Sequence, residues 1–244
     1  MIIDSHIHCG KELPFERIAP LLQEGGIDGV CLFSPVEDIY DRYDFNFKDS
    51  PEWQLRRREA NRYLRTLSET KSNIFPYFFV WNDFDIDELS LGYKGIKWHR
   101  HEDEPVYNYS DNRCRRLIDK IVELKLPIVF EESYSNTLYF INKLAPDAIV
   151  IIPHLGMLNG GFFAIDESGI WNNERIYTDS SLASSNTINA FLNKYGSHKL
   201  LFGSDFPFGR PASELRKILS LKIPDKDKGA IVGGNILRLL SIKN

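Results

Sequence analysis

The chain has 244 residues, of which 43% are hydrophobic and 26% charged, and its formal net charge is −4. This length fits one α/β barrel, because such barrels run to roughly 200–250 residues as one unit. The acidic balance gives no electrostatic reason to expect nucleic acid or an anionic membrane as a partner.

Three cysteines without a CxxC pair do not suggest a disulfide framework. The N-terminus has no basic leader followed by a long apolar run, and no stretch reaches the roughly 20 apolar residues needed to span a bilayer. We therefore expect a reduced, cytoplasmic setting.

Short apolar runs recur along the chain, and most are followed by a helical pattern. Several are apolar almost throughout, as expected of parallel strands that are buried on both faces. The runs cover residues 1–8, 29–34, 74–80, 93–99, 127–131, 148–154, 175–180 and 199–203.

Between these runs, apolar residues repeat at three and four positions, which predicts amphipathic helices. The clearest repeats are Cys114, Leu117, Ile118, Ile121 and Val122, then Ile188, Phe191, Leu192 and Tyr195 before Gly196. Further helices are predicted after Pro211 and over residues 225–240. Alternating strands and helices imply a parallel sheet. We expect residues 1–244 to form a single-domain (β/α)8 TIM barrel, with a doubly wound open sheet as the alternative.

The first run ends in Asp4-Ser5-His6-Ile7-His8. Side chains two apart in a strand point to the same face, so His6 and His8 can bind one metal ion together. Alone the pattern is weak, because His-x-His also occurs by chance.

Two more polar residues follow predicted strands. His154 ends the sixth run and Asp205 comes just past the eighth, at the strand ends where barrel enzymes place catalytic groups. Singly, each has an ordinary explanation, as a packed core histidine or an Asx-turn. Together with His6 and His8 they form a nitrogen and oxygen ligand set suited to Zn²⁺, Mn²⁺ or Fe²⁺.

These motifs resemble those of the amidohydrolase superfamily, in its amidohydrolase-related branch. Besides the opening motif, the resemblance rests on Gly95-Ile96-Lys97-Trp98-His99, Pro153-His154-Leu155-Gly156, Gly203-Ser204-Asp205-Phe206-Pro207 and the closing Asn235-Ile236-Leu237-Arg238-Leu239-Leu240. The motifs occur in the right order from end to end of the chain. The branch includes hydrolases of amides and lactones and also non-oxidative decarboxylases.

One segment departs from the family pattern. The branch usually has a metal-ligand histidine after the fifth strand, where this chain has Glu131 followed by Glu132. Glu131 could bind the metal or bridge two metals, Glu132 could take that role, or the site has lost a ligand. The resemblance implies His6, His8, His154 and Asp205 as metal ligands, and we expect Glu131 to join them in place of the usual histidine.

The fourth run supplies two more candidates, Lys97 and His99, on one face of the strand. We expect His99 to contact the substrate or to be an additional ligand, with a packing role as the alternative. Lys97 is a structural lysine or, as in sister branches, a carboxylated bridge. His101 is expected in an exposed loop and His198 on the opposite face of the barrel, both without a role.

The segment of residues 35–50 is long and aromatic, with Tyr40, Tyr43, Phe45 and Phe47. It is either a lid or substrate wall, or a loop pinned to the barrel by its aromatic side chains. Arg210 is a surface residue or a partner for a substrate carboxylate. The cluster Arg56-Arg57-Arg58 is expected on a solvated helix face.

The resemblance implies a metal-dependent hydrolase acting on an amide, ester or lactone bond of a small molecule. One or two divalent ions, zinc first and manganese or iron as alternatives, would activate water. Asp205 would be the general base and acid, and His99 or the metal would polarise the carbonyl. A decarboxylase and a non-catalytic metal-binding relative are the alternatives, and the compact chain favours the hydrolase. No nucleic acid or membrane partner is expected, and a homodimer is allowed for.

Overall fold

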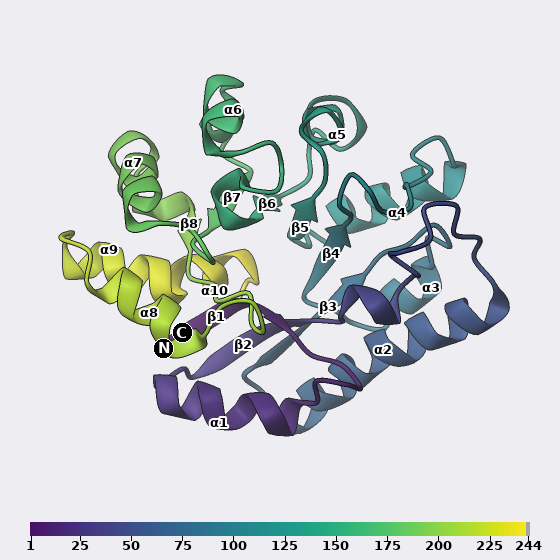
Figure 1. The fold of residues 1–244 in the computed structure, drawn as a ribbon, viewed down its shortest axis with the longest axis horizontal. Helices are drawn as coiled ribbons and strands as arrows, with labels where there is room; N and C mark the ends of the chain where they lie inside the picture. Colours follow the sequence, from purple (N-terminus) through teal and green to yellow (C-terminus); the bar gives the residue numbers. More distant parts are fainter. Residues whose placement is uncertain (243–244) are drawn as a thin grey trace.

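The computed structural model describes residues 1–242 and contains eight parallel strands that neighbour one another in chain order (Figure 1). The strands are β1 Ile3–His8, β2 Gly29–Phe33, β3 Ile74–Phe79, β4 Gly95–His99, β5 Ile128–Glu131, β6 Val150–Ile152, β7 Ile176–Asp179 and β8 Leu200–Leu201. The predicted (β/α)8 TIM barrel is confirmed, and the doubly wound alternative is wrong, because that sheet would reverse its strand order.

Hydrogen bonds just beyond β8 bring the last strand against the first. The Ser5 amide donates to the Phe202 carbonyl at 2.9 Å, and the Asp205 amide donates to the His6 carbonyl at 2.7 Å. The regular part of β8 is shorter than the predicted run of residues 199–203. The contact between residues 5–6 and 202–205 nevertheless sets Asp205 directly beside the His-x-His motif.

The helices lie outside the strands (Figure 1). They are α1 Phe15–Gly25, α2 Pro51–Thr70, α3 Ile86–Leu89, α4 Asn112–Glu123, α5 Tyr134–Tyr139, α6 Phe162–Glu167, α7 Ser185–Tyr195, α8 Pro211–Leu219, α9 Asp225–Gly229 and α10 Asn235–Leu239. The predicted helices are present, and α4 buries its apolar stripe. The last predicted helix consists of α9 and α10 joined by the π-helical segment Ala230–Gly234.

One prediction on α2 is wrong. Arg57 is 2% exposed rather than solvated, because the segment of residues 35–50 packs over the helix. Its guanidinium donates to the Ile39 carbonyl at 2.6 Å and to the carboxylates of Asp49 and Asp83 at 2.8 and 2.7 Å. A buried arginine with these partners fastens the segment to the barrel.

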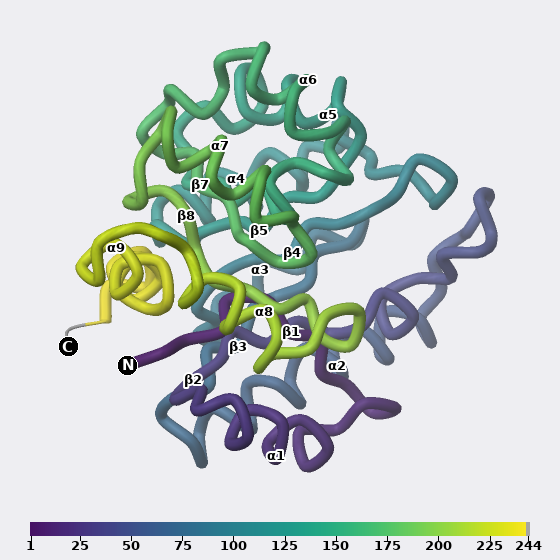
Figure 2. The backbone as a smooth tube through the Cα atoms, turned by 60° about the vertical axis from the view of Figure 1, so that its left-hand side comes forward, coloured from purple at the N-terminus to yellow at the C-terminus, as the bar shows by residue number. Residues whose placement is uncertain are grey.

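A separate apolar cluster fills the barrel interior, where alternate strand residues meet. It includes Ile3 of β1, Phe33 of β2, Val129 of β5 and Leu201 of β8. Leucine and isoleucine side chains of α10 belong to the same cluster, so α10 covers the end at which the strands begin. Figure 2 shows the yellow C-terminal helices beside β1. The opposite end, where the strands finish, is left for polar side chains.

An irregularity in β1 decides which side chains reach that polar end. The pairing between β1 and β2 shifts between Asp4 and Ile7, so β1 has one extra residue there. Strict alternation would place Ile3 and His6 on opposite faces. Because of the bulge, Ile3 joins the interior cluster and His6 still lies above it among the site residues.

Within residues 1–242, every helix is too short or too polar to cross a bilayer.

Candidate metal centre and active site

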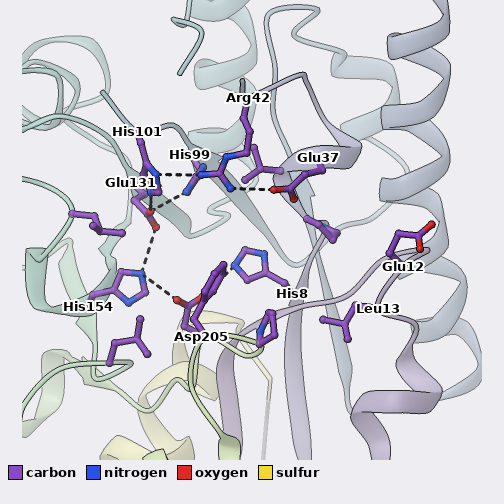
Figure 3. Close-up of a pocket in the computed structure, with 16 residues that line it drawn as sticks. His8, Glu12, Leu13, Glu37, Arg42, His99, His101, Glu131, His154 and Asp205 are labelled. Carbon is purple, nitrogen blue, oxygen red and sulfur yellow. Dashed lines mark hydrogen bonds and ion pairs between the residues drawn. The ribbon is translucent and has the colours of Figure 1, made fainter. Parts of the chain in front are cut away.

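A cavity of about 480 Å³ opens at the carboxyl ends of the strands (Figure 3). Five of the residues given a site role from the sequence line it, namely His8, His99, Glu131, His154 and Asp205. His6 lies beneath the wall and is fully buried. The rest of the wall is largely apolar and includes Leu13, Pro35, Val36, Leu158, Leu182, Pro207 and Phe208.

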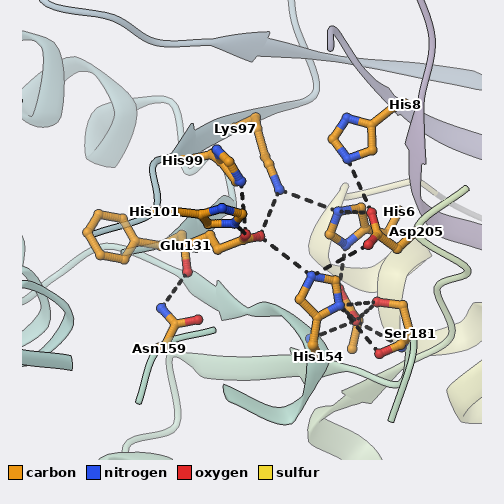
Figure 4. Close-up of polar contacts among 12 residues, drawn as sticks. His6, His8, Lys97, His99, His101, Glu131, His154, Asn159, Ser181 and Asp205 are labelled. Atoms are coloured by element: carbon orange, nitrogen blue, oxygen red, sulfur yellow. Dashed lines mark hydrogen bonds and ion pairs between the residues drawn. The ribbon is translucent and has the colours of Figure 1, made fainter. Parts of the chain in front are cut away.

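Four side chains form an inner cluster, consisting of His6, His8, His154 and Asp205 (Figure 4). Asp205 Oδ1 lies 3.2 Å from His6 Nε2 and 3.2 Å from His8 Nε2. Asp205 Oδ2 lies 3.8 Å from His154 Nε2. Donor atoms that share one tetrahedral ion at about 2.0–2.1 Å lie about 3.3 Å from one another. The inner cluster therefore fits a divalent metal ion.

Asp179, at the end of β7, holds two of these imidazoles from behind. Its Oδ2 accepts a hydrogen bond from His6 Nδ1 at 2.9 Å, and its Oδ1 accepts one from the Ser181 hydroxyl. The Ser181 oxygen lies 2.8 Å from His154 Nδ1. A carboxylate behind a ligand histidine fixes its tautomer and raises its basicity. The sequence analysis missed Asp179 and Ser181, although a polar Asp-Ser-Ser segment after a buried strand was a usable signal.

The surroundings of the inner cluster leave one imidazole neutral and draw positive charge toward another. Burial, with the Lys97 ammonium, lowers the pKa of His6 to about 4, so its imidazole is neutral and has a free electron pair. Burial also opposes the charged form of His154, but Glu131, Asp179 and Asp205 outweigh it and raise the pKa of His154 to about 9. The carboxylates therefore attract positive charge strongly to the position of His154 Nε2.

His154 and Asp205 both have left-handed backbones, with φ of 55° and 54°. Such conformations cost of order 1–3 kcal/mol for residues other than glycine, and they cluster at functional sites. Here the His154 amide donates to Asp179 Oδ1 at 3.0 Å, and the Asp205 amide donates to the His6 carbonyl. These bonds hold the two turns so that both side chains project toward His6.

The two glutamates at the end of β5 point to different surroundings. Glu131 is 3% exposed and lies on the cavity wall, with Oε2 at 3.5 Å from His154 Nε2. Glu132 is directed away, and its carboxylate accepts hydrogen bonds from Arg100 at 3.0 Å and from Tyr109 at 3.1 Å. Of the alternatives for this segment, the geometry places Glu131 rather than Glu132 beside the candidate ligands.

Lys97 is fully buried between the inner cluster and Glu131. Its Nζ donates to Glu131 Oε2 at 3.3 Å and lies 3.4 Å from His6 Nε2 (Figure 4). An ion pair with Glu131 compensates for the cost of burying the ammonium.

The sequence predicts His101 in an exposed loop without a role, but its side chain is half-buried and lines the cavity. Its Nε2 lies 3.0 Å from Glu131 Oε1, and His99 Nε2 lies 2.9 Å from the same oxygen. The chain after β4 folds back at Glu104, which accepts a hydrogen bond from the His101 amide at 3.0 Å. This turn brings His101 to the cavity, and polar composition alone does not reveal it.

Residues 35–50 form part of the cavity wall, and their aromatic side chains divide in two. Tyr40 is fully buried and stacks on Trp81 with 3.9 Å between the ring centroids, so it pins the segment to the barrel. Tyr43 and Phe45 are exposed. The wall itself is made by neighbours in the same segment, including Val36 and Arg42.

Two other candidates lie away from the cavity. Arg210 is exposed beyond the Asp205 turn and does not line the cavity wall. His198 is exposed at the start of β8, on the opposite end of the barrel, as expected.

The amidohydrolase family profile matches residues 3–242. No curated protein in the comparison matches the chain. Among solved structures, the chain is similar to 5-carboxyvanillate decarboxylase from Sphingomonas paucimobilis, with a TM-score of 0.73, 13% identity and 99% of each chain covered. It is also similar to a proposed 2-pyrone-4,6-dicarboxylic acid hydrolase from Pseudomonas putida, with a TM-score of 0.72, 15% identity, 100% of this chain and 98% of that one covered.

A third similar structure is a dihydroxybenzoic acid decarboxylase from Polaromonas with bound manganese, with a TM-score of 0.73, 14% identity, and 98% of this chain and 96% of that one covered. Because a decarboxylase and a hydrolase both match from end to end, the compactness of the chain does not separate the two reactions. The match of the family profile over almost the whole sequence, together with the strand-end histidines and carboxylates, shows that the chain belongs to the amidohydrolase family.

Proposed function

We propose that this protein is a metal-dependent hydrolase that cleaves an amide, ester or lactone bond of a small, largely apolar and uncharged molecule. The observation that carries the proposal is the position of Asp205, whose carboxylate contacts the ligand nitrogens of His6 and His8 and also lines the cavity.

Asp205 is suited to the work of a general base. Burial raises its pKa, but the adjacent His6 and His8 outweigh burial and hold the pKa of Asp205 well below its usual range. The carboxylate is therefore ionised at neutral pH and can accept a proton from water that enters the cavity. The same carboxyl group can then return the proton to the leaving group.

His6, His8 and His154 would hold the ion with Asp205, and Glu131 lies close enough to His154 to join them. Zinc is our first choice, because imidazole nitrogen with carboxylate oxygen is a usual zinc ligand set. When bound, a divalent ion supplies Lewis-acid activation of water and of the substrate carbonyl. His99 lines the cavity beside Glu131, where it can contact the substrate.

The charges on the wall favour hydrolysis over decarboxylation. A decarboxylase must hold a substrate carboxylate. The metal ion can bind it, so any preference between the reactions depends on whether the wall supplies a further cation. Arg42 is the one lysine or arginine among the described lining residues, and it is paired with Glu37 at 3.2 Å and with Glu104. Lys97 is paired with Glu131 beneath the wall. Neutral, apolar substrates fit this lining better than carboxylates do.

The test is a substrate panel assayed with zinc-loaded and chelator-treated protein. It contains neutral aryl esters, lactones and anilides beside aromatic carboxylic acids. We expect turnover of a neutral member that is lost on chelation and restored by zinc, without release of CO₂ from any acid. Release of CO₂ from a carboxylic acid, with no cleavage of the neutral compounds, would contradict the proposal and favour a decarboxylase.

A further inference from the structure

Three side chains at the rim of the cavity form an outer triad, consisting of His99, His101 and Glu131. His99 comes from the end of β4, His101 from the turn that follows it and Glu131 from the end of β5. His99 Nε2 and His101 Nε2 lie 2.9 and 3.0 Å from Glu131 Oε1, and all three ligand atoms lie within 4.8 Å of one another. Figure 4 shows both rings directed at the carboxylate.

Glu104 lies behind both imidazoles of the outer triad. Its Oε1 is 3.5 Å from His101 Nδ1, and its Oε2 is 3.9 Å from His99 Nδ1. The Arg42 guanidinium, which pairs with the same carboxylate, also lies 3.2 Å from His101 Nδ1. The carboxylate is 3% exposed and is held by the Tyr40 hydroxyl at 2.7 Å. The outer triad thus repeats the design of the inner cluster, where Asp179 lies behind His6. A carboxylate behind a ligand imidazole is a regular feature of metal sites.

The hydrogen bonding of His99 is incomplete when Glu131 is its only partner. A proton on Nε2, shared with Glu131, leaves an electron pair on Nδ1, and the buried Nδ1 has no hydrogen-bond partner. That electron pair faces the Glu104 carboxylate, and the two negatively polarised groups repel each other. A cation on Nε2 would move the proton to Nδ1, where Glu104 can accept it. His99 is therefore better satisfied with a metal ion than without one.

Glu131 is shared between the two groups of ligands. Its Oε1 faces His99 and His101, and its Oε2 faces His154 at 3.5 Å and Lys97 at 3.3 Å. A carboxylate with one oxygen toward each group can bind two ions at once. All three members of the outer triad also line the cavity, so a substrate can reach that position.

We infer that the outer triad is a second divalent-cation site, in which His99 Nε2, His101 Nε2 and Glu131 Oε1 are the protein ligands and Glu131 bridges to the inner cluster. Three protein ligands leave a coordination position open to water or substrate. The inference rests on the metal-dependent function proposed above. It assigns His99 and Glu131 to the second ion and gives His101 a ligand role.

The test is a titration of the metal-free, full-length protein with Co²⁺, followed by calorimetry and visible absorption. Wild type is expected to bind two ions per chain, with magnetic coupling between them in electron paramagnetic resonance. His101→Gln is the decisive variant, because the side chain is 36% exposed and its loss leaves the core intact. It should bind one ion and lose the coupling, and His99→Gln should do the same. His198→Gln, an exposed histidine at the far end of the barrel, should bind two.

The outcomes separate the two proposals. One ion in wild type, or a second ion retained by both His101→Gln and His99→Gln, would overturn the second site and leave the proposed function standing. No bound ion in wild type would overturn both.

Discussion

The Asp179 carboxylate joins two candidate metal ligands that come from different strands, since it accepts hydrogen bonds from the His6 ring at 2.9 Å and from the His154 amide at 3.0 Å. Ser181 extends the connection to the His154 ring. The orientation of both imidazoles therefore depends on the buried Asp179 side chain, which does not itself contact the candidate metal position.

Replacing Asp179 with asparagine should weaken metal binding without removing a ligand. Loss of such an outer partner typically costs 10–100-fold in metal affinity. We expect a loss of about this size for zinc, measured by competition with a chromophoric chelator. Asp166→Asn is the matched control, because Asp166 pairs with Lys194 on the outer surface. Unchanged zinc affinity in Asp179→Asn would show that the imidazoles do not need this support.

Asp205→Asn should separate catalysis from metal binding. Three histidines of the inner cluster remain as ligands, whereas the base is lost. A general base contributes typically 10²–10⁴-fold, so we expect kcat to fall by about that factor while most of the metal is retained. The measurement is metal content and kcat on the same preparation, with Asp87→Asn, at an exposed position of α3, as control. Parallel loss of both quantities would assign Asp205 to metal binding alone.

Lys97→Met should destabilise the metal-free protein, because it leaves the buried Glu131 carboxylate without its ammonium partner. Breaking a buried pair in this way costs about 3 kcal/mol or more. Zinc should then raise the Tm of the variant more than that of wild type, since the ion replaces the lost charge. Lys194→Met, which breaks a surface pair with Asp166, should have little effect. An equal zinc response in Lys97→Met and wild type would contradict this electrostatic role.

The three cysteines should not react in the native protein. Cys9, Cys31 and Cys114 are free and fully buried. Burial raises the pKa of the Cys9 and Cys114 thiols to about 12 and that of Cys31 further, so little thiolate forms at neutral pH. We expect no fast reaction with an aromatic disulfide reagent until denaturant is added, and then three thiols per chain. Rapid reaction of the folded chain would show that at least one of these cysteines is accessible to the reagent.

The sequence predicts the barrel and its strand ends because strands buried on both faces appear as short, nearly continuous apolar runs. Each run could be placed to within a few residues, and the polar residue that follows it marks the catalytic end. His154 and Asp205 were found in this way. The same logic applied to Asp179, which ends β7, but a carboxylate beside serines has many ordinary roles, and only its contacts with His6 and His154 identify it.

Features that depend on tertiary contacts could not be predicted. His101 lies in a polar run, and such a run predicts an exposed loop. Its side chain lies in the cavity because Glu104 accepts a hydrogen bond from the His101 amide and closes the turn after β4. The sequence predicts Arg57 to be exposed with Arg56 and Arg58. In the folded protein the segment of residues 35–50 covers it. The bulge in β1 lies where this strand contacts residues 202–206, which come from near the other end of the chain.

The central claim is that the strand-end cluster of His6, His8, His154 and Asp205 holds a divalent metal ion. Elemental analysis of protein purified without added metal or chelator tests it most directly. We expect at least one transition-metal ion per chain, with one ion fewer in His6→Ala and an unchanged content in His198→Ala. Absence of metal in wild type, with no rise in Tm on adding Zn²⁺ or Mn²⁺, would contradict the claim and remove the basis for a metal-dependent hydrolase.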